Sequence, residues 1–326
     1  MSPYIRDLSH RNAAERLQQL TSLLLLDTGT PSNWGQLEEI TPSSLGLAKA
    51  NSSVPYEIDI DKVSRLNSEN TYSLTYRELW ESFGIMDVSF QIEIGTLFEL
   101  SIDLVSNQTL GDETVYAFEV ETKKSGMPVS ASLSSYVVVE AFVDHVTSLT
   151  SSNGTGSFSV NIPNSLNGTT LLIAFAQAKV NPQMVSFNVH AFDHNLSNPS
   201  PDKAFLNLSP LNHVLNVTFN YPSTEILKAQ VFTFNYNFSL TESAQGEQTV
   251  EYDIPRLLDS SPMIMALTGF NGSSSFAEWV SYPQLPLQIG SDFGESTAGA
   301  KIVSQITIVT INHALYEVVT KWGGPD

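Results

Sequence analysis

Apolar and polar side chains alternate along much of the chain from residue 87 onward, and this period constrains the fold more than any other feature. The alternation is clearest at residues 88–94, 98–104, 158–162 and 232–240. A period of two places the apolar side chains on one face of a strand and the polar ones on the other, as in half-buried antiparallel strands. Turn-forming Asn-Gly and Ser-Gly pairs recur between the segments. The sequence therefore predicts a mainly β fold.

The residues before this region differ because their apolar spacing is helical. A helix is predicted at residues 4–27, where an apolar stripe recurs every three or four positions. The stripe consists of Ala13, Leu17, Leu20 and Leu24. A second, short helix is predicted at residues 75–83. Thr75 and Glu78 have the spacing of a capping box there, and Gly84 suits the left-handed position after the helix.

The length of 326 residues allows two or three domains. We expect a helical and loop segment at residues 1–86, a discontinuous β-domain formed by residues 87–113 and 193–326, and a module inserted at residues 114–192. The first helix needs an apolar sheet face, and the few strands before residue 105 cannot supply one. The expected fold is mainly β, with an N-terminal helix packed on a β-sandwich-like domain and a second β-sandwich module.

The inserted segment resembles a known kind of module. It contains the run "GMPVSASL" and, further on, the run "SSNGTGSFSVNIP". This order is similar to small Ig-like or transthyretin-like surface modules, in which a Gly-x-Pro-Val entry precedes one strand and a Gly-x-Gly-x-Phe turn opens the next hairpin. The resemblance implies an Ig-like β-sandwich at residues 114–192.

Nine asparagines stand in N-glycosylation sequons. They are Asn51, Asn107, Asn153, Asn167, Asn195, Asn207, Asn216, Asn237 and Asn271. About a fifth of the chain is Ser or Thr, so about four sequons are expected by chance. An acceptor asparagine implies a solvent-facing position on an exported protein, although a chain rich in Ser, Thr and Asn also produces sequons by composition. Strand alternation directs Asn216 and Asn237 outward, and Asn153, Asn167 and Asn271 stand in predicted Asn-Gly turns.

The charge and the cysteine count exclude several classes of protein. Asp and Glu number 34 and Lys and Arg 15, which gives a net charge of 15 − 34 = −19. Such a surface repels phosphate backbones, so we expect no nucleic-acid partner. The chain has no cysteine, which excludes disulfides, thiolate metal sites and a cysteine nucleophile. No apolar run approaches the ~18 residues of a membrane span. We expect membrane attachment only through an upstream segment that the sequence lacks.

Two histidines carry the spacing of a metal motif. His190 and His194 flank Asp193 in the run "HAFDH". On a helix both imidazoles would share one face, as in zinc proteases. The surrounding residues alternate as a strand, on which the two would lie roughly 13 Å apart at about 3.3 Å per residue. The pattern favours a strand over a zinc site, and no metal ligand is predicted.

Three carboxylates alternate with apolar residues near the middle of the N-terminal segment. Glu57, Asp59 and Asp61 would share one face of a strand spanning residues 56–61. Carboxylates on one strand face could hold Ca²⁺ with help from carbonyl oxygens. Such carboxylates more often form a solvated edge that discourages aggregation.

No catalytic signature is present in the sequence. We find no Gly-x-Ser-x-Gly elbow, no phosphate-binding loop and no dinucleotide fingerprint. Paired carboxylates for glycoside hydrolysis could still come from distant positions. The tryptophans could form a sugar-binding platform or lie in the core. They are Trp34, Trp80, Trp279 and Trp322.

The two ends of the chain resemble archaeal surface proteins with type IV pilin-like (class III) export signals. The N-terminal runs are "AAERLQQLTSLLLLDTGTPSNWG", "SSLGLA" and "IDKVSRLN", and the C-terminal run is "VTINHALYEVVTKWGG". The matching N-terminal positions are Gly29, Pro31, Trp34, Gly46 to Ala48, Lys62, Val63 and Leu66. The resemblance implies the soluble part of a secreted surface protein, without the apolar helix by which such proteins assemble.

Together these features predict a non-enzymatic protein outside the cell or on its surface. We expect a structural or adhesive role, as a pilin-like filament subunit or a component associated with a pilus. Its expected partners are further copies of itself, other surface subunits and N-linked glycans, and no cofactor or catalytic residue is predicted. The alternative is a secreted carbohydrate-active hydrolase or a carbohydrate-binding protein, which would show two carboxylates about 5–10 Å apart in a cleft.

Overall fold

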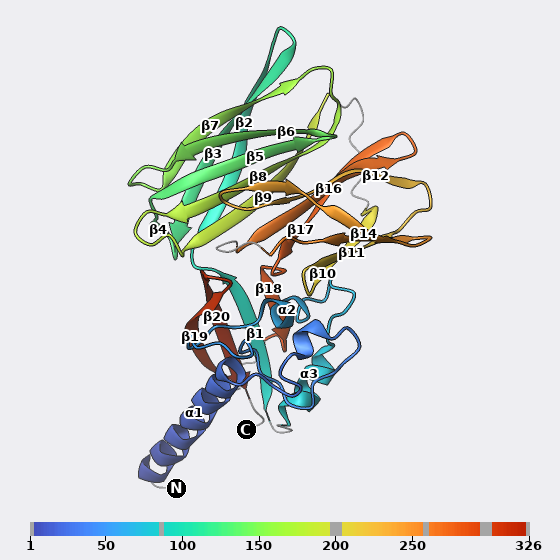
Figure 1. The fold of residues 1–326 in the computed structure, drawn as a ribbon. Helices are drawn as coiled ribbons and strands as arrows, with labels where there is room; N and C mark the ends of the chain where they lie inside the picture. Colours follow the sequence, from blue (N-terminus) through green and yellow to red (C-terminus); the bar gives the residue numbers. More distant parts are fainter. Residues whose placement is uncertain (1–2, 85–87, 196–203, 257–260, 294–301, 324–326) are drawn as a thin grey trace. The chain divides into compact units, whose positions relative to one another are not determined.

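The computed structural model describes residues 3–84, 88–195, 204–256, 261–293 and 302–323, with side chains from residue 15 onward. Across these ranges the chain forms twenty strands, arranged in antiparallel sheets, and few helices, so the mainly β prediction is confirmed (Figure 1).

The chain divides into two compact units. Unit 1 comprises residues 1–95, 284–312 and 316–326, and unit 2 comprises residues 96–283 and 313–315.

These bounds differ from the ranges expected from the sequence. Residues 99–110 pair along their whole length with the next strand, from Glu99 opposite Lys123 to Leu110 opposite Glu113. They therefore belong with the strands that follow them in the chain, in unit 2, and not with the C-terminal strands.

Unit 1 contains the helices and one four-stranded sheet. Its helical elements are α1 (Pro3–Leu26), the 3₁₀ turn η1 (Trp34–Gln36), α2 (Ile60–Ser64) and α3 (Tyr76–Phe83). Its strands are β1 (Ser89–Thr96), β18 (Leu287–Gly290), β19 (Ile302–Ile311) and β20 (Ala314–Gly323), in the sheet order β18-β1-β20-β19. An aromatic cluster joins α3 to the sheet, because the ring of Phe83 lies 4.9 Å from Phe90 and 5.5 Å from Trp322 between centroids.

The helix α1 confirms the first predicted helix, but its packing is confined to its C-terminal end. Leu24 and Leu25 are fully buried, and the Thr21 hydroxyl lies 2.9 Å from that of Thr320 on β20. The indole of Trp322 also donates to Thr21 Oγ1 over 2.9 Å. The earlier stripe positions, at residues 17 and 20, are only half-buried, and Figure 1 shows the first turns leading away from the rest of unit 1.

The helix α3 has the ends expected from its sequence. The Thr75 hydroxyl accepts the backbone N–H of Glu78, and the Glu78 carboxylate accepts the backbone N–H of Thr75 over 2.8 Å. Gly84 closes the helix with a φ of 65°. The capping box and the glycine stop are both confirmed.

Unit 2 begins with two sheets packed face to face. One sheet contains β2 (Glu99–Leu110), β3 (Glu113–Lys124), β4 (Met127–Pro128) and β7 (Thr155–Pro163). The other has the order β6 (Phe142–Leu149), β5 (Ala131–Val139), β8 (Gly168–Ala178) and β9 (Val185–His194). One core fills the space between them, with Tyr116, Phe118 and Val120 facing Val137 and other side chains of the second sheet.

Two further sheets complete unit 2. The first has the order β10 (Leu206–Leu211), β11 (Val214–Phe219), β15 (Thr249–Asp253) and β14 (Thr241–Gln245). The second has the order β13 (Asn237–Ser239), β12 (Thr224–Phe232), β16 (Met263–Asn271) and β17 (Ser274–Tyr282). A second core joins Tyr136 of β5 and Phe175 of β8 to Phe232 and Ile264 of this last sheet. The strands β5 and β8 are therefore buried on both faces, which explains their nearly continuous apolar runs.

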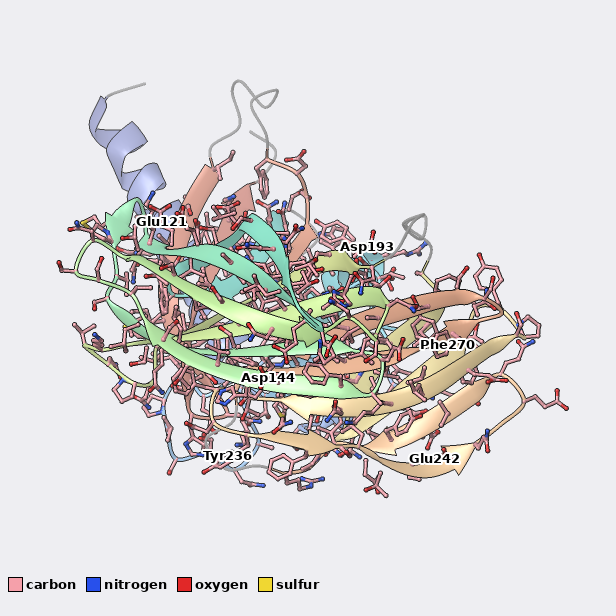
Figure 2. The ribbon with its side chains drawn as sticks, turned by 90° about the horizontal axis from the view of Figure 1, so that it is seen from above. Glu121, Asp144, Asp193, Tyr236, Glu242 and Phe270 are labelled. Atoms are coloured by element: carbon pink, nitrogen blue, oxygen red, sulfur yellow. The ribbon has the colours of Figure 1, made fainter. Side chains whose placement is uncertain are left out.

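The sequence predicted one strand over residues 232–240. The structure instead places the end of one strand and a second, short strand in this segment. The strand β12 ends at Phe232, the N–H of Thr233 donates to the carbonyl of Tyr236 over 2.8 Å, and β13 returns antiparallel from Asn237. Tyr236, labelled in Figure 2, and Phe238 are exposed, as the tip of a hairpin allows. A period of two continues through this turn, so alternation alone could not reveal it.

Candidate functional site

The nine sequon asparagines lie on the surface of the two units. Seven are exposed, and the other two, Asn216 and Asn271, are half-buried. Asn51 belongs to unit 1, and the remaining eight belong to unit 2. The acceptor positions are therefore concentrated on unit 2.

Local structure presents several of these asparagines to solvent. Asn153 stands in the turn before β7, where its N–H donates to Ser151 Oγ over 3.2 Å and Gly154 has a φ of 74°. Asn237 opens the edge strand β13, and Ser239, which completes its sequon, is also exposed. In both places the acceptor and its hydroxyl partner are open to solvent in the folded chain.

Two of the exposed acceptors are constrained by their surroundings. The side-chain amide of Asn195 donates to the carbonyls of Asn164 and Leu166, over 3.3 Å and 3.2 Å. A glycan would replace one hydrogen of that nitrogen and disturb these bonds. Asn207 is exposed, but Ser209 of its sequon is fully buried.

The two histidines of the "HAFDH" run lie on β9, as the alternation indicated. His194 is fully buried, and its Nδ1 lies 2.8 Å from the Tyr116 hydroxyl, with Nε2 3.1 Å from the carbonyl of Pro163. His190 instead packs against the ring of Phe118. Burial lowers the pKa of His194 below its ordinary value of 6.5, which favours the neutral imidazole. Both nitrogens of His194 are thus occupied in packing the core of unit 2.

The three carboxylates expected on one strand face are not on a strand. Asp59 is the N-cap of α2, and its Oδ1 accepts the N–H groups of Asp61 and Lys62 over 3.0 Å and 3.2 Å. Glu57 forms an ion pair of 2.8 Å with Lys49. Because residues 60–64 form a helix and are not extended, the alternation in the sequence does not place the three carboxylates on one strand face. Over the portion of the chain with described structure, no group of three or more His, Asp or Glu residues is arranged to hold a metal ion.

The tryptophans divide between core and surface. Trp34 and Trp322 are fully buried, Trp80 is half-buried, and only Trp279 of these four is exposed, at 37%. They do not form a common platform, because the two fully buried rings are covered by other residues.

The residues of the N-terminal resemblance converge on one buried cluster in unit 1. The indole of Trp34 donates to the carbonyl of Gly46 over 3.0 Å. The ammonium of Lys62 lies 5.8 Å from the Trp34 ring and donates to the carbonyls of Thr28 and Ala48 over 2.8 Å and 2.7 Å. A side chain at position 46 would approach the backbone nitrogen of Gly29 to 2.6 Å. The cluster therefore ties the end of α1 to the loop that follows it.

Arg65 is the member of this cluster that the sequence did not reveal. Its guanidinium is buried and donates to five backbone carbonyls over 2.7–3.3 Å. These carbonyls belong to Trp34, Leu37, Glu38, Ile40 and Tyr72. One usable signal is a basic residue three positions after another basic residue, in a short helical segment that follows a long loop whose carbonyls need donors. We call Trp34, Gly46, Lys62 and Arg65 the loop cluster.

Burial changes the protonation of Lys62. Removal of the ammonium from water lowers its pKa from 10.5 to about 8, although the negative charges of Asp59 and Asp27 oppose this. Because the unfolded chain holds this proton up to higher pH, the folded state gains stability as the pH rises from about 8 toward 10.5. A neutral amine can still donate to both carbonyls.

We therefore expect the free energy of unfolding of wild-type unit 1 to rise by about 2 kcal/mol between pH 7 and about pH 9.5, relative to that of a Lys62→Met variant. The measurement is denaturant unfolding followed by tryptophan fluorescence, since three of the four tryptophans lie in unit 1. An equal pH response in both proteins would show that Lys62 keeps an ordinary pKa.

Unit 2 contains a cavity of about 280 Å³. It is lined by Gln177, Pro182, Gln183, Val185, Thr233, Phe234, Asn235, Ser261, Pro262, His313 and Ala314. Amides and hydroxyls are present, but no carboxylate is among these residues, so the cavity lacks the acidic pair that glycoside hydrolysis requires. In Figure 2 the labelled carboxylates Glu121, Asp144, Asp193 and Glu242 lie apart from one another.

A half-buried carboxylate of unit 2 holds the start of a strand. Glu278 on β17 accepts the N–H groups of Phe205 and Leu206, over 2.5 Å and 3.1 Å. Burial raises its pKa above the ordinary value of 4.5, and the two hydrogen bonds partly offset that effect. This contact fixes the start of β10.

The fold thus defines a mainly β protein of antiparallel sheets, and none of its described helices is both long and apolar enough to cross a membrane. No family model matches the chain, and no curated protein matches it in sequence.

Solved structures that match include HBP35 of Porphyromonas gingivalis, at 11% identity and a TM-score of 0.22. The match covers 59% of this chain and 64% of that one. A red sea bream transglutaminase matches at 10% identity and a TM-score of 0.22, over 66% of this chain and 32% of that one. At these TM-scores the likeness carries no argument about fold or function.

Proposed function

We propose that this chain is a non-enzymatic surface protein that acts outside the cell, as a pilin-like filament subunit or a component associated with a pilus. Unit 2 carries most of the glycans, and the helix α1 of unit 1 serves attachment or assembly. We further propose that residues 114–192 form an Ig-like module within unit 2. The partners are further copies of the chain or other surface subunits.

The distribution of sequons is the observation that carries this proposal. Unit 2 contains eight of the nine sequon asparagines, and none of the nine is buried. Glycans are bulky and polar, so they occupy faces that remain in solvent. A unit that carries one sequon is free to approach a membrane or another subunit.

The loop cluster supports the resemblance to archaeal pilin-like proteins. Trp34, Gly46 and Lys62 belong to the resembling runs and lie in mutual contact with the end of α1. A cluster at this position holds the helix at a defined direction relative to the sheet of unit 1. Such a helix is suited to connect the unit to an upstream anchor.

Glycopeptide mapping of the protein from its native host tests the proposal. We expect at least four occupied sequons, foremost Asn153, Asn167, Asn216, Asn237 and Asn271. Asn195 and Asn207 are expected to stay unmodified in the folded protein. A native chain whose intact mass shows no modification would overturn the proposal.

A matched pair of variants checks that any added mass comes from the sequon. Thr155→Ala removes the sequon of Asn153 and leaves the asparagine in place, so it should remove one glycan mass. Ser152→Ala changes a hydroxyl in the same turn without altering the sequon, so it should leave the mass of the glycans unchanged. Hydrolytic activity lost on replacement of a single carboxylate would instead favour the enzyme alternative.

A further inference from the structure

The strand β19 (Ile302–Ile311) has an unusual composition for the edge of a sheet. It is the last strand in the order β18-β1-β20-β19, and Figure 1 shows no described strand beyond it in unit 1. Its sequence, "IVSQITIVTI", contains no charged residue, proline or glycine. Edge strands in soluble proteins usually carry such residues, because an uninterrupted apolar edge pairs with other chains.

The apolar side chains of this strand are open to solvent. Ile306 is 63% exposed, Ile308 51% and Ile302 38%. They alternate along β19, so they share one face of the sheet. The opposite face is covered toward the end of the strand, where Val309 and Ile311 are buried.

The direction of the backbone groups follows from Thr310, which has backbone partners outside the sheet. The N–H of Thr310 donates to the carbonyl of Tyr56, and its carbonyl accepts the N–H of Ile58, each over 2.9 Å. Backbone groups alternate between the two sides of a strand. The N–H and C=O groups of residues 302, 304, 306 and 308 therefore point away from β20, toward the open edge.

A second copy of the same strand fits this edge, because an antiparallel partner centred on residue 305 presents its own outward backbone groups at the same four positions. Antiparallel pairing of two copies centred there places Ile302 opposite Ile308 and Ser304 opposite Ile306. Each copy would satisfy the edge groups of the other, as in the two-fold interfaces of homodimers. The chain carries a net charge of −19, and an uncharged strand lets two copies meet without direct repulsion.

We propose that the open edge of β19 pairs antiparallel with β19 of a second copy of this chain, joining the sheets of the two units 1 into one. This inference deepens the proposed function, on which it rests for the assembly of copies, and it names the surface that is used. The bridge at Thr310 ends the available edge, so the pairing covers residues 302–308. The sequons remain on unit 2 and are not needed for it.

Sedimentation of the full chain over a range of concentrations tests the pairing. We expect a reversible dimer, and Ser304→Pro should weaken it at least tenfold because proline removes an N–H that points to the partner. Proline is tolerated at a strand edge when its missing N–H faces away from the sheet, so the variant should fold. Ile306→Lys should weaken the dimer similarly. Leu149→Lys, at an exposed position of unit 2, is the matched control and should leave it unchanged.

Charge complementation tests the register. In the antiparallel arrangement residue 306 faces residue 304 of the other copy, so a mixture of Ile306→Lys and Ser304→Glu chains should form a heterodimer more tightly than either variant pairs with itself. A parallel arrangement would place equal positions together and give no such gain.

A chain that stays monomeric at all concentrations would overturn the inference. Assemblies that form but ignore both Ser304→Pro and Ile306→Lys would overturn it too, while leaving the proposed surface role intact. Conversely, a β19 dimer of a protein that is unglycosylated in its host would keep this inference and refute the proposed function.

Discussion

Replacement of Arg65 by methionine is expected to lower the free energy of unfolding of unit 1 by about 3–5 kcal/mol. The Arg65 guanidinium is fully buried, and it donates to five backbone carbonyls of residues 34–40 and 72. Methionine fills a similar volume but donates nothing, so all five carbonyls lose a donor. The Trp34 and Leu37 carbonyls keep the backbone N–H groups of Leu37 and Ile40, and a buried carbonyl left without a donor costs about 1–3 kcal/mol. Equilibrium unfolding followed by tryptophan fluorescence measures the loss.

Two further variants separate this role from a general effect of charge. Arg77 is exposed and pairs with Glu81 on the same helix, so Arg77→Met should change stability by less than about 1 kcal/mol. Arg65→Lys keeps the charge but cannot reach five carbonyls with one ammonium, so it should recover only part of the loss. If Arg65→Lys had the same free energy of unfolding as the wild type, the five hydrogen bonds of the guanidinium would not be the source of the stability.

Replacement of Gly46 by alanine is expected to cost unit 1 about 3 kcal/mol. A Cβ at this position would lie 2.6 Å from the carbonyl carbon of Asp27 and 2.6 Å from the nitrogen of Gly29. Both are backbone atoms, so neither can rotate away as a side chain could. The end of α1 would have to separate from the loop, which would also disturb the bond from Trp34 to the Gly46 carbonyl.

Gly95→Ala is the matched control, because a Cβ at Gly95 meets no other atom within 4 Å. Gly95 also belongs to unit 1, so the same unfolding measurement applies to both variants. We expect the control to stay within about 1 kcal/mol of the wild type. Equal effects of the two substitutions would show that the cost does not come from the close approach at position 46.

Both predictions concern the long loop between α1 and α2, whose backbone hydrogen bonds are turns and single bridges and leave further buried carbonyls to be bound by side chains. Between α1 and α2 the chain forms one 3₁₀ turn and isolated bridges but no regular strand. Its buried carbonyls therefore need donors from elsewhere. Lys62 and Arg65 supply them from the α2 region, and Trp34 lies 5.8 Å and 5.7 Å from the two cations. This arrangement ties the end of α1 to the loop that follows it.

Features that depend on neighbours in the chain could be predicted from the sequence. The capping box of Thr75 and Glu78, the glycine stop at Gly84, and the helix over residues 3–26 are local, and each is present. The strand containing Leu215 and Val217 also follows the predicted alternation, with both side chains fully buried. The mainly β class follows from the same period of two.

Features that depend on distant partners were decided only by the tertiary structure. The reversal after Phe232 leaves the alternation intact, so it cannot be seen in the pattern. Asp59 caps a helix in the structure, although its spacing with Glu57 fitted a strand. The strands β5 and β8 are covered on both faces because a second sheet packs on them.

The loop cluster shows the same division most clearly. The sequence identified Trp34, Gly46 and Lys62 through a resemblance, yet it left Arg65 unnoticed. The five carbonyls that Arg65 binds lie 7 to 31 positions away along the chain. A buried cation is stable only where such acceptors are brought together, and that condition belongs to the folded chain as a whole. The sequence thus determined the local elements and the surface-directed sequons, while tertiary packing decided which polar groups became the core of unit 1.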